Sequence, residues 1–384
     1  MKRVAVIGGG PAGAFAAENL ARSGLDTVLV DEKLAWEKPC GGGLTYKAYQ
    51  RYPFLIENSH PKRIVNDMCI AAPKAGAVKM GLRQPLLIYS RFDLNRMLLE
   101  RAEQAGAKLE KTRVLEIRRS GGGWLVKTRH GAIEADYCVV ATGGRNSLRD
   151  FGTQWTAGDT MYALGYYAAY QQEHVDIQFL PDLQGYIWVF PRCGHVSVGI
   201  GAKGESAQSL RVRLERYMDE KGIPYRGATF FAHMLPSLES RRWKTNRVAG
   251  EGWFAVGDAG GLVDPITGEG LYYAIRSAEL ASQVLLNESR SPVEKAQAYS
   301  SLLNRDFAAD LEFGASLAKR LFVGKFFFGT VPARTVEFIR RSPRFRVLIG
   351  DLVAGTQPYL DLKTRLLKNL HSTLGEVVAN RLFA

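Results

Sequence analysis

The 384-residue sequence is poor in cysteine and histidine, and it has no long apolar run. Its four cysteines, Cys40, Cys69, Cys138 and Cys193, lie too far apart in the chain for a CxxC redox pair or a zinc motif. Scattered cysteines in a chain of this size are typical of reduced, intracellular thiols. The six histidines form no HxxxH or HExxH pattern, so we expect no metal site. A GxSxG nucleophile elbow is also missing.

The apolar segments are too short to enter a membrane as helices. None reaches the roughly 18 residues that a membrane-spanning helix needs. The apolar run after Lys2 and Arg3 stops at Ile7, which is too short for the core of a signal peptide. We therefore expect a cytoplasmic protein, with peripheral attachment to the inner face of the membrane as the alternative.

Acidic residues are the scarcer charged type, since 51 Lys and Arg stand against 38 Asp and Glu and give a net charge of +13. Such an excess favours an anionic partner: nucleic acid, phospholipid or a phosphorylated ligand. Apolar residues form 46% and charged residues 23% of the chain, which excludes a disordered chain, a collagen and a disulfide scaffold. Glycine is abundant, with 40 residues against a usual share of about 7%.

The N-terminal segment has the pattern of a dinucleotide site. A β-branched run at residues 2–7 precedes the sequence GGGPAG at residues 8–13, and a helix-forming segment follows at residues 14–23. A second expected strand, residues 25–30, ends at Asp31. Strand, GxGxxG, helix, strand and acid in this order are specific for a nucleotide-binding βαβ unit.

Each glycine of this motif has a physical role. Gly8 permits the tight turn, Gly10 lets backbone N–H groups approach a pyrophosphate, and Gly13 lets the helix pack closely on the strand. Asp31 is placed to accept hydrogen bonds from an adenosine ribose. The motif by itself fits NAD and FAD equally.

Three later segments favour FAD. Residues 91–106 form an amphipathic helix, and residues 114–141 read as a β-meander that ends in the glycine pair 143–144. Far downstream, a buried strand leads into the glycine-rich residues 257–261. A second glycine-rich stretch, residues 264–270, precedes a further helix.

This ordered set of motifs resembles the FAD-dependent oxidoreductases of the aromatic-hydroxylase fold, and within them the geranylgeranyl reductase family. Three local sequences carry the family resemblance: PCGGGL at residues 39–44, YIWVFP at residues 186–191 and DPITGEG at residues 264–270. The resemblance extends over about residues 1–290.

The predicted fold class is α/β with an α+β insert. We expect a Rossmann-type FAD-binding domain with a parallel sheet and a β-meander, formed by residues 1–158 and 245–290. An antiparallel-sheet substrate domain is inserted at residues 159–244, and residues 291–384 form a basic helical region. Within the insert the expected elements are strands at 161–170, 175–180, 186–190 and 196–200 and a helix at 206–221.

The resemblance assigns a set of residues to FAD. Asp258 would bind the ribityl chain, and the helix N-terminus at residues 268–270 would face the flavin and the diphosphate. Arg91 would reach the cofactor; the alternative is a solvated arginine at the start of a helix. The predicted cofactor-binding residues are Gly8, Gly10, Pro11, Ala12, Gly13, Asp31, Glu32, Lys33, Cys40, Gly41, Gly42, Arg91, Val114, Ala141, Thr142, Gly143, Asp258, Ala259, Gly268, Glu269, Gly270 and Leu271.

The candidate catalytic residues are Cys40, Tyr186 and Trp188. In this fold the segment around Cys40 passes near the flavin ring, so its thiol is either a redox or proton-handling group or a small buried thiol. Tyr186, Trp188 and Phe190 alternate along one strand and therefore share a face. That face is either an ordinary aromatic core or the wall of an apolar tunnel for a prenyl chain.

The sequence of the aromatic strand also distinguishes the reductase interpretation from the halogenase alternative. Flavin-dependent halogenases carry Trp where Tyr186 stands and Ile where Phe190 stands, so the sequence sides with the reductases. One departure from the reductase pattern is the family's proline upstream of the tyrosine. Leu183 stands three positions before Tyr186, and Pro181 lies two positions further back.

The resemblance implies an FAD-dependent oxidoreductase that reduces C=C bonds of a lipophilic isoprenoid, such as a polyprenyl lipid or a quinone side chain. An isolated alkene accepts hydride poorly, so a positioned acid in a dry site must supply a proton. No separate NADPH-binding domain is visible in the sequence, and we expect transient NAD(P)H or a ferredoxin-like protein as electron donor. The alternatives are a flavin monooxygenase or halogenase acting on a hydrophobic or aromatic small molecule, an electron-transfer flavoprotein, and a non-enzymatic flavin-binding module.

The C-terminal region is basic and aromatic. Residues 319–346 hold eight Lys or Arg residues against the single acid Glu337, with aromatics at Phe322 and at residues 326–328. We expect these aromatics to pack as a helical cap on a sheet, with an interfacial membrane surface as the second interpretation. No nucleic-acid recognition module accompanies the charge, so no nucleic-acid partner is expected.

Overall fold

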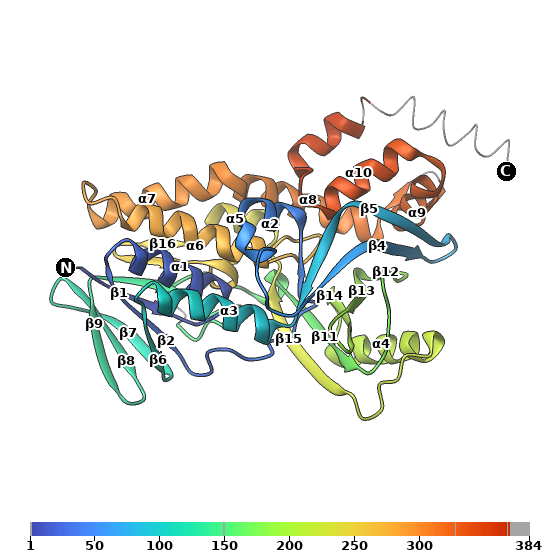
Figure 1. Cartoon of the computed structure of the whole chain (residues 1–384). Coiled ribbons are helices and arrows are strands. Elements are labelled where there is room, and N and C mark those ends of the chain that lie inside the picture. Colours follow the sequence, from blue (N-terminus) through green and yellow to red (C-terminus); the bar gives the residue numbers. More distant parts are fainter. Residues whose placement is uncertain (1, 149, 327, 367, 369–384) are drawn as a thin grey trace. The chain divides into compact units, whose positions relative to one another are not determined.

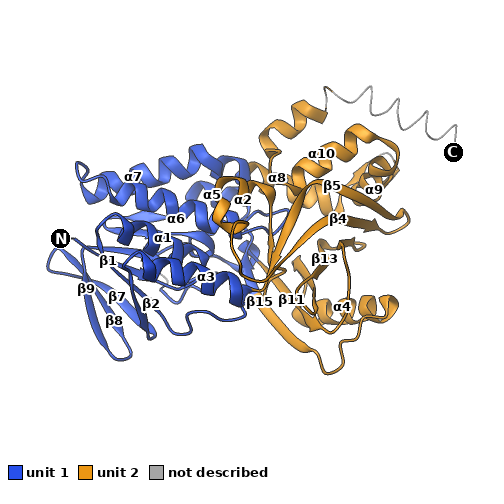
Figure 2. Cartoon of the chain, viewed as in Figure 1, with its two compact units in different colours: residues 1–38, 91–160, 234–312 blue, residues 39–90, 161–233, 313–384 orange. Residues whose placement is uncertain are grey.

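The computed structural model describes residues 2–148, 150–326, 328–366 and 368. The chain divides into two compact units (Figure 2). Unit 1 comprises residues 1–38, 91–160 and 234–312, and unit 2 comprises residues 39–90, 161–233 and 313–384. Because the chain passes several times from one unit to the other, neither is a continuous piece of sequence.

A six-stranded sheet forms the centre of unit 1 (Figure 1). The apolar residues of strand β1 (Arg3–Ile7) are all buried, which is typical of a parallel sheet with both faces covered. All its strand pairs are parallel except β16 with β17. In spatial order the strands are β16 (Ala249–Gly250), β17 (Trp253–Ala255), β10 (Tyr137–Val140), β1 (Arg3–Ile7), β2 (Asp26–Asp31) and β6 (Lys108–Lys111).

Four main helices accompany this sheet. Helix α1 begins with Pro11 at its first position, where the missing N–H costs no hydrogen bond. It packs against both α3 and α6, and α6 packs against α7. These helices are α1 (Pro11–Arg22), α3 (Arg91–Gln104), α6 (Leu271–Leu285) and α7 (Pro292–Leu303).

A three-stranded antiparallel sheet lies between β6 and β10 in sequence. The predicted meander occurs, and its last predicted strand leaves it to join the parallel sheet as β10. Two short 3-10 turns and one short helix complete the regular elements of this unit, together with a π-helical turn. These elements are β7 (Val114–Ser120), β8 (Gly123–Thr128), β9 (Gly131–Ala135), η2 (Ala157–Asp159), α5 (Ser240–Thr245), η3 (Gly257–Gly260) and η4 (Asn304–Ala308).

An eight-stranded sheet makes up most of unit 2. Its strand pairs are antiparallel apart from β12 with β4, which run parallel. In spatial order the strands are β15 (Thr229–Pro236), β11 (Thr160–Ala168), β14 (Val196–Lys203), β13 (Gln184–Pro191), β12 (Val175–Phe179), β4 (Lys62–Ala72), β5 (Gly76–Tyr89) and β3 (Gly43–Leu44). The four predicted strands of the insert are therefore β11 to β14.

Helix α4 (Ala207–Lys221) covers one face of this sheet. Ser206 caps its first turn by accepting the Ser209 N–H, and Gly222 ends it in the left-handed conformation with φ of 65°. Its apolar residues share a fully buried cluster with Ile187 and Val189 of β13. The even-numbered aromatics of β13 consequently point to the opposite face.

The C-terminal helices pack partly as the predicted cap. Val336 and Ile339 of α9 are fully buried against β4 and β5, and Phe322 of α8 is 7% exposed. Phe326 and Phe328 are exposed instead, whereas Phe327 lies outside the described residues. The remaining elements of unit 2 are α2 (Tyr46–Arg51), η1 (Pro53–Leu55), β18 (Lys325–Phe326), β19 (Gly329–Thr330), α9 (Val331–Arg341) and α10 (Pro343–Val353), and α8 (Ala309–Val323) begins in unit 1.

The predicted fold class is confirmed: a Rossmann-like parallel sheet and a separate, mostly antiparallel sheet are both present. The unit boundaries differ from the predicted ranges in three main places. Residues 39–90 belong to unit 2, because β4 pairs with β12 of the insert and β5 pairs with β4. Residues 234–244, predicted as part of the insert, belong to unit 1. The predicted region 291–384 is divided between the two units at residue 312.

Helices long and apolar enough to cross a bilayer do not occur in the described ranges. In the same part of the chain, no three His, Cys, Asp or Glu side chains gather as a metal site would require.

Candidate FAD and substrate sites

The glycine-rich loop joins β1 to α1 in unit 1 as predicted. The Gly8 N–H donates to the Val30 carbonyl at 2.9 Å, which ties the loop to the end of β2. Gly8 has φ of 112°, and a Cβ there would lie 2.3 Å from the Ala141 carbonyl oxygen. A Cβ at Gly13 would lie 1.8 Å from the Gly8 carbonyl oxygen. Both positions therefore require glycine for the packing of the loop itself.

Gly10 differs from these two glycines. A Cβ built on it meets no heavy atom of the described residues within 4 Å, so this part of the chain leaves the space beside it open. Gly10 precedes Pro11 at the start of α1, where backbone N–H groups have no partner within the helix. Open space beside a helix N-terminus fits a bound diphosphate.

Asp31 at the end of β2 binds backbone N–H groups of the protein itself. Its carboxylate accepts the Gly9 N–H at 2.7 Å and the N–H groups of Lys33 and Leu34 at 2.7 and 2.6 Å. A carboxylate offers about four acceptor positions, so one remains for a ribose hydroxyl. Asp31 shapes the loop as well as being a candidate ligand.

Glu32 and Lys33 follow Asp31 at the surface. The Glu32 carboxylate lies 4.0 Å from Arg113 and 3.8 Å from Arg129. The Lys33 ammonium lies 4.1 Å from the centre of the Trp36 ring. Neither side chain contributes to the glycine-rich loop through these contacts.

Arg91 is buried, with only 4% of its surface exposed, so the alternative of a solvated arginine is wrong. Its Nη2 donates weakly to Asn95 at 3.4 Å, and its buried Nε–H has no hydrogen-bond partner among the described residues. A buried guanidinium N–H without a partner is costly, and an acceptor on a ligand would remove that cost. The first residues of α3 are capped by Glu37, which accepts the N–H groups of Arg91 and Phe92 at 3.0 and 3.1 Å.

Asp258 lies in the turn after β17, where the motif predicts it. It forms an ion pair with Lys38 at 3.0 Å, and both side chains are largely buried. A Cβ at Gly270, the residue before α6, would lie 3.4 Å from Asp258 Oδ1. A Cβ at Gly143 would lie 3.7 Å from the Lys38 ammonium. Three predicted segments that are distant in sequence therefore meet around Lys38.

The remaining predicted cofactor residues of unit 1 are mostly buried or hydrogen-bonded to other residues of the protein. The Thr142 hydroxyl donates to Asn146 at 2.8 Å, and Glu269 accepts the Tyr272 N–H at 2.6 Å, which caps α6. Gly268 has φ of 69°, a conformation that glycine adopts without strain. Val114 is half-buried on β7. The predicted residues Pro11, Ala12, Ala141, Ala259 and Leu271 are buried.

In unit 2 the Cys40 segment packs on the aromatic strand. Cβ atoms at Gly41 and Gly43 would lie 2.7 and 2.9 Å from the Phe190 ring. Gly42 has φ of 85°, and its Cβ would lie 1.9 Å from the Tyr89 carbonyl oxygen. Gly41 and Gly42 were predicted to bind FAD, and the structure shows that the protein's own Phe190 ring and Tyr89 carbonyl lie beside their α-carbons.

The three predicted catalytic residues lie in the same unit. The Cys40 carbonyl accepts the Ser197 hydroxyl at 3.2 Å, and the Trp188 indole N–H donates to that same hydroxyl at 3.4 Å. Trp188 packs flat over Gly199, where a Cβ would lie 2.2 Å from the ring. The Tyr186 ring stacks on Phe322 with centroids 6.4 Å apart and an interplanar angle of 18°.

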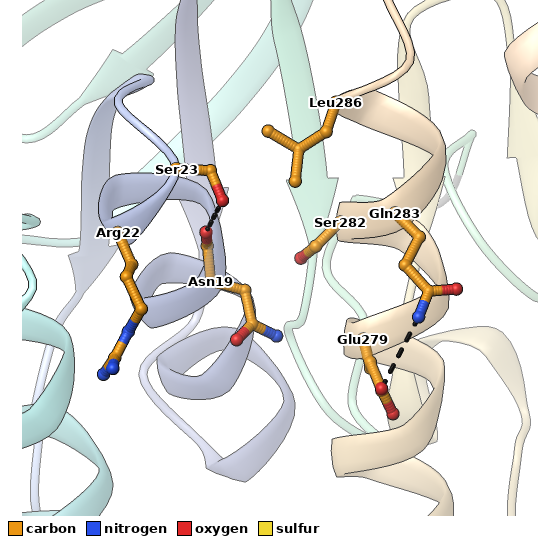
Figure 3. A pocket seen from close by; sticks show the side chains of 7 residues that line it. All are labelled: Asn19, Arg22, Ser23, Glu279, Ser282, Gln283 and Leu286. Atoms are coloured by element: carbon orange, nitrogen blue, oxygen red, sulfur yellow. Dashed lines mark hydrogen bonds between the residues drawn. The ribbon is translucent and has the colours of Figure 1, made fainter.

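A surface depression of about 240 Å³ in unit 1 lies elsewhere (Figure 3). It is formed by the C-terminal turn of α1 and the end of α6. Helix α1 is 12 residues long, or about 18 Å, and the glycine-rich loop is at its other end. The depression is therefore separate from the glycine-rich loop. Its lining residues are Asn19, Arg22, Ser23, Glu279, Ser282, Gln283 and Leu286.

Five residues near these sites are missing from the sequence prediction. Lys38 and Glu37 directly precede the PCGGG motif, so their position was a signal. Arg192 directly follows the YIWVFP motif and so had the same signal. Ser197 and Phe322 had no comparable signal, because they contact the motif residues only through the fold.

Comparison with known proteins supports the same cofactor. A family model described as pyridine nucleotide-disulphide oxidoreductase matches residues 2–161, the region that carries the glycine-rich loop. The open space at Gly10 and the unpartnered Arg91 N–H fit an FAD molecule. The chain is an FAD-dependent oxidoreductase, and FAD is its cofactor.

Within this class, its sequence relatives are geranylgeranyl reductases, which confirms the predicted resemblance. A chloroplastic geranylgeranyl diphosphate reductase of Oryza sativa subsp. japonica is 32% identical over 74% of this chain, which spans 66% of that protein, just under two thirds. A menaquinone reductase of Mycolicibacterium smegmatis is 28% identical and covers 96% of this chain and 91% of its own length.

Solved structures share the fold. A geranylgeranyl bacteriochlorophyll reductase-like protein of Thermoplasma acidophilum has a TM-score of 0.79 at 22% identity, and covers 96% of this chain and 98% of its own. A flavin-dependent brominase has a TM-score of 0.70 at 15% identity, and covers 97% of this chain and 99% of its own. At these identities the likeness establishes the fold alone, so it does not separate reductase from halogenase chemistry.

Proposed function

We propose that the protein reduces C=C bonds of a lipophilic isoprenoid, either a polyprenyl lipid or the side chain of a quinone. The observation that carries this proposal is the packing of the Cys40 segment against the aromatic strand, where the Cys40 carbonyl and the Trp188 indole N–H both hydrogen-bond to the Ser197 hydroxyl. A thiol and an aromatic face in one unit provide a proton carrier and an apolar surface. The near full-length match to a menaquinone reductase supports the quinone side chain as a substrate.

The protein has to hold FAD and to deliver a proton. We propose that the loop at Gly8–Gly13 and the buried Arg91 hold the dinucleotide, with Asp258 as a ligand of the ribityl chain. When bound, FAD supplies a hydride in its reduced form. The Tyr186 hydroxyl and the Cys40 thiol are the two candidate acids, and the surrounding aromatic side chains would exclude water.

The proposed electron donor is transient NAD(P)H or a ferredoxin-like protein. We place the protein in the cytoplasm, peripherally attached to the inner face of the membrane, because a lipid substrate is found there. The exposed Phe326 and Phe328, next to the exposed Lys325, are suited to such attachment.

The test is an anaerobic assay with the FAD-loaded protein. Chemically reduced protein is mixed with geranylgeranyl diphosphate or a menaquinone, and the product is measured by mass spectrometry. We expect two hydrogens to be added for each reduced double bond, with no oxygen incorporated. Cys40→Ala and Tyr186→Phe variants compare the two acids. The variant that lacks the acting acid should lose about 100-fold or more in turnover.

The competing function is a monooxygenase or halogenase, as in the brominase that shares the fold. Such an enzyme requires oxygen and incorporates an oxygen or a halogen atom into its product. Product formation that depends on air, with no anaerobic saturation of any isoprenoid tested, would refute the reductase proposal.

A further inference from the structure

The Cys40 carbonyl is the meeting point of two buried side chains in unit 2. Arg192 donates from Nη2 to this oxygen at 2.6 Å, and the Ser197 hydroxyl donates to it at 3.2 Å. Arg192 is 3% exposed and Ser197 is fully buried. Strand β3 begins only at Gly43, so these side chains hold the carbonyl ahead of the strand.

The rest of the segment leaves the thiol little freedom. The Gly42 N–H donates to the Cys40 sulfur at 3.3 Å, and Gly42 itself is fixed in the left-handed region against Tyr89. The orientation of the peptide between Cys40 and Gly41 is therefore set by the group that binds its carbonyl oxygen. Among the two donors, Arg192 carries the charge and makes the shorter hydrogen bond.

Arg192 is itself held in one place. Its guanidinium lies 4.9 Å from the centre of the Tyr167 ring, and Tyr167 packs on Phe231 with centroids 4.6 Å apart. Its own backbone N–H donates to the His195 carbonyl at 2.8 Å. A guanidinium fixed by an aromatic face and by the end of a hairpin is suited to hold a neighbouring loop.

We propose that Arg192 is a positioning residue that binds the Cys40 carbonyl and thereby fixes the direction of the Cys40 thiol. This inference rests on the proposed function, in which that thiol is a candidate proton donor. Arg192 acts through Cys40 and does not itself transfer a proton.

The test measures the thiol directly in the full-length, FAD-loaded protein. A Cys69→Ser/Cys193→Ser background leaves Cys40 and Cys138, and burial raises the pKa of Cys138 to about 12, which makes it unreactive. The rate of Cys40 alkylation by iodoacetamide is followed against pH. We expect Arg192→Met to change this rate about fivefold or more, and Arg192→Lys to keep it within about twofold of the background.

Turnover gives a second measurement. We expect Arg192→Met to lower kcat about 100-fold with KM within about threefold, because the thiol is misplaced while the substrate surface is kept. Arg213 is the matched control, since it is a half-buried arginine of the same unit that donates to the Pro181 carbonyl at 3.4 Å. Arg213→Met should leave both measurements unchanged.

The outcomes separate the two proposals. Unchanged alkylation of Cys40 in Arg192→Met overturns the positioning role, even if turnover falls. Dependence of alkylation on Arg192, in a protein that saturates no isoprenoid, supports the positioning role and refutes the proposed function. If Arg192→Met does not fold, Arg192→Gln removes the charged donor while keeping a polar side chain, and an unchanged alkylation rate there overturns the inference.

Discussion

The two glycine-rich segments of this protein, residues 8–13 in unit 1 and residues 41–43 in unit 2, differ in what occupies the space beside their α-carbons. In the first segment Gly8 and Gly13 face the protein's own backbone, while Gly10 faces open space. In the second segment all three glycines face protein atoms, namely the Phe190 ring or the Tyr89 carbonyl. A run of glycines indicates that other atoms approach the backbone closely. The structure shows at which glycines those atoms belong to the protein itself.

The largest expected effect comes from Gly13→Ala. Its Cβ would lie 1.8 Å from the Gly8 carbonyl oxygen, and backbone atoms there cannot move without displacing the loop. We expect the free energy of unfolding of the FAD-free protein to fall by about 3 kcal/mol or more, measured by urea denaturation.

Gly10→Ala is the matched control for that variant. With no atom within 4 Å of the new Cβ, it should cost no more than about 1 kcal/mol, the loss of glycine at a helix N-cap. FAD affinity, measured by fluorescence titration, should fall about tenfold or more, because the methyl group enters the space proposed for the diphosphate. Equal instability of the two variants would remove the distinction between protein-facing and ligand-facing glycines.

Gly42→Ala should have the next largest effect. The substitution forces alanine to φ of 85° and puts its Cβ 1.9 Å from the Tyr89 carbonyl oxygen. We expect a loss of about 2–3 kcal/mol in the free energy of unfolding, with FAD affinity within about threefold of wild type. A selective loss of FAD binding without loss of stability would show that Gly42 faces the cofactor after all.

Gly41→Ala tests the ring contact. Its Cβ would lie 2.7 Å from a Phe190 ring carbon, so we expect a loss of about 1–2 kcal/mol. Phe190→Val removes the ring, and the same glycine substitution in that background should then cost about 1 kcal/mol less. Strictly additive losses in the double-mutant cycle would mean that the ring does not explain the glycine.

The smallest expected effect concerns Asp159, a carboxylate in unit 1 that accepts hydrogen bonds from other residues of the protein. Burial raises the pKa of Asp159, but hydrogen bonds from Thr156 and Arg242 outweigh it, so the pKa lies below its ordinary value. Its stabilising contribution is thus complete above pH about 4 and is lost as the pH falls through the lowered pKa.

Asp159→Asn should therefore destabilise the protein by about 1 kcal/mol at pH 7, and the difference from wild type should shrink below pH about 4. Urea denaturation at several pH values measures this, with Glu134→Gln, an exposed position, as the control. A difference that does not change with pH would contradict the assigned partners.

Local patterns predicted most of the regular elements. The glycine-rich loop, the insert strands and helix α4 occur close to their predicted positions, because apolar periodicity and capping residues act over a few neighbours. The predicted domain ranges differ from the units where long-range pairing decides. Strand β4 pairs with β12, more than 100 residues later, and no local signal contains that pairing.

The candidate sites show the same limit. The motifs contain Asp258 and Cys40, but their partners Lys38 and Arg192 lie 220 and 152 residues away in sequence. Only the packed structure brings these pairs together, because a buried charge or carbonyl takes whichever donor the fold supplies.

The amino-acid sequence by itself determined a dinucleotide site, since the turn, the helix start and the acid of such a site are local requirements of backbone geometry. The later motifs indicated FAD through their resemblance to a known family. The tertiary structure decided the rest. It buried Arg91 without a full set of partners, turned Gly10 toward open space and filled the space beside Gly41 with Phe190. Those differences depend on which distant atoms pack against each residue, and packing is a property of the folded chain as a whole.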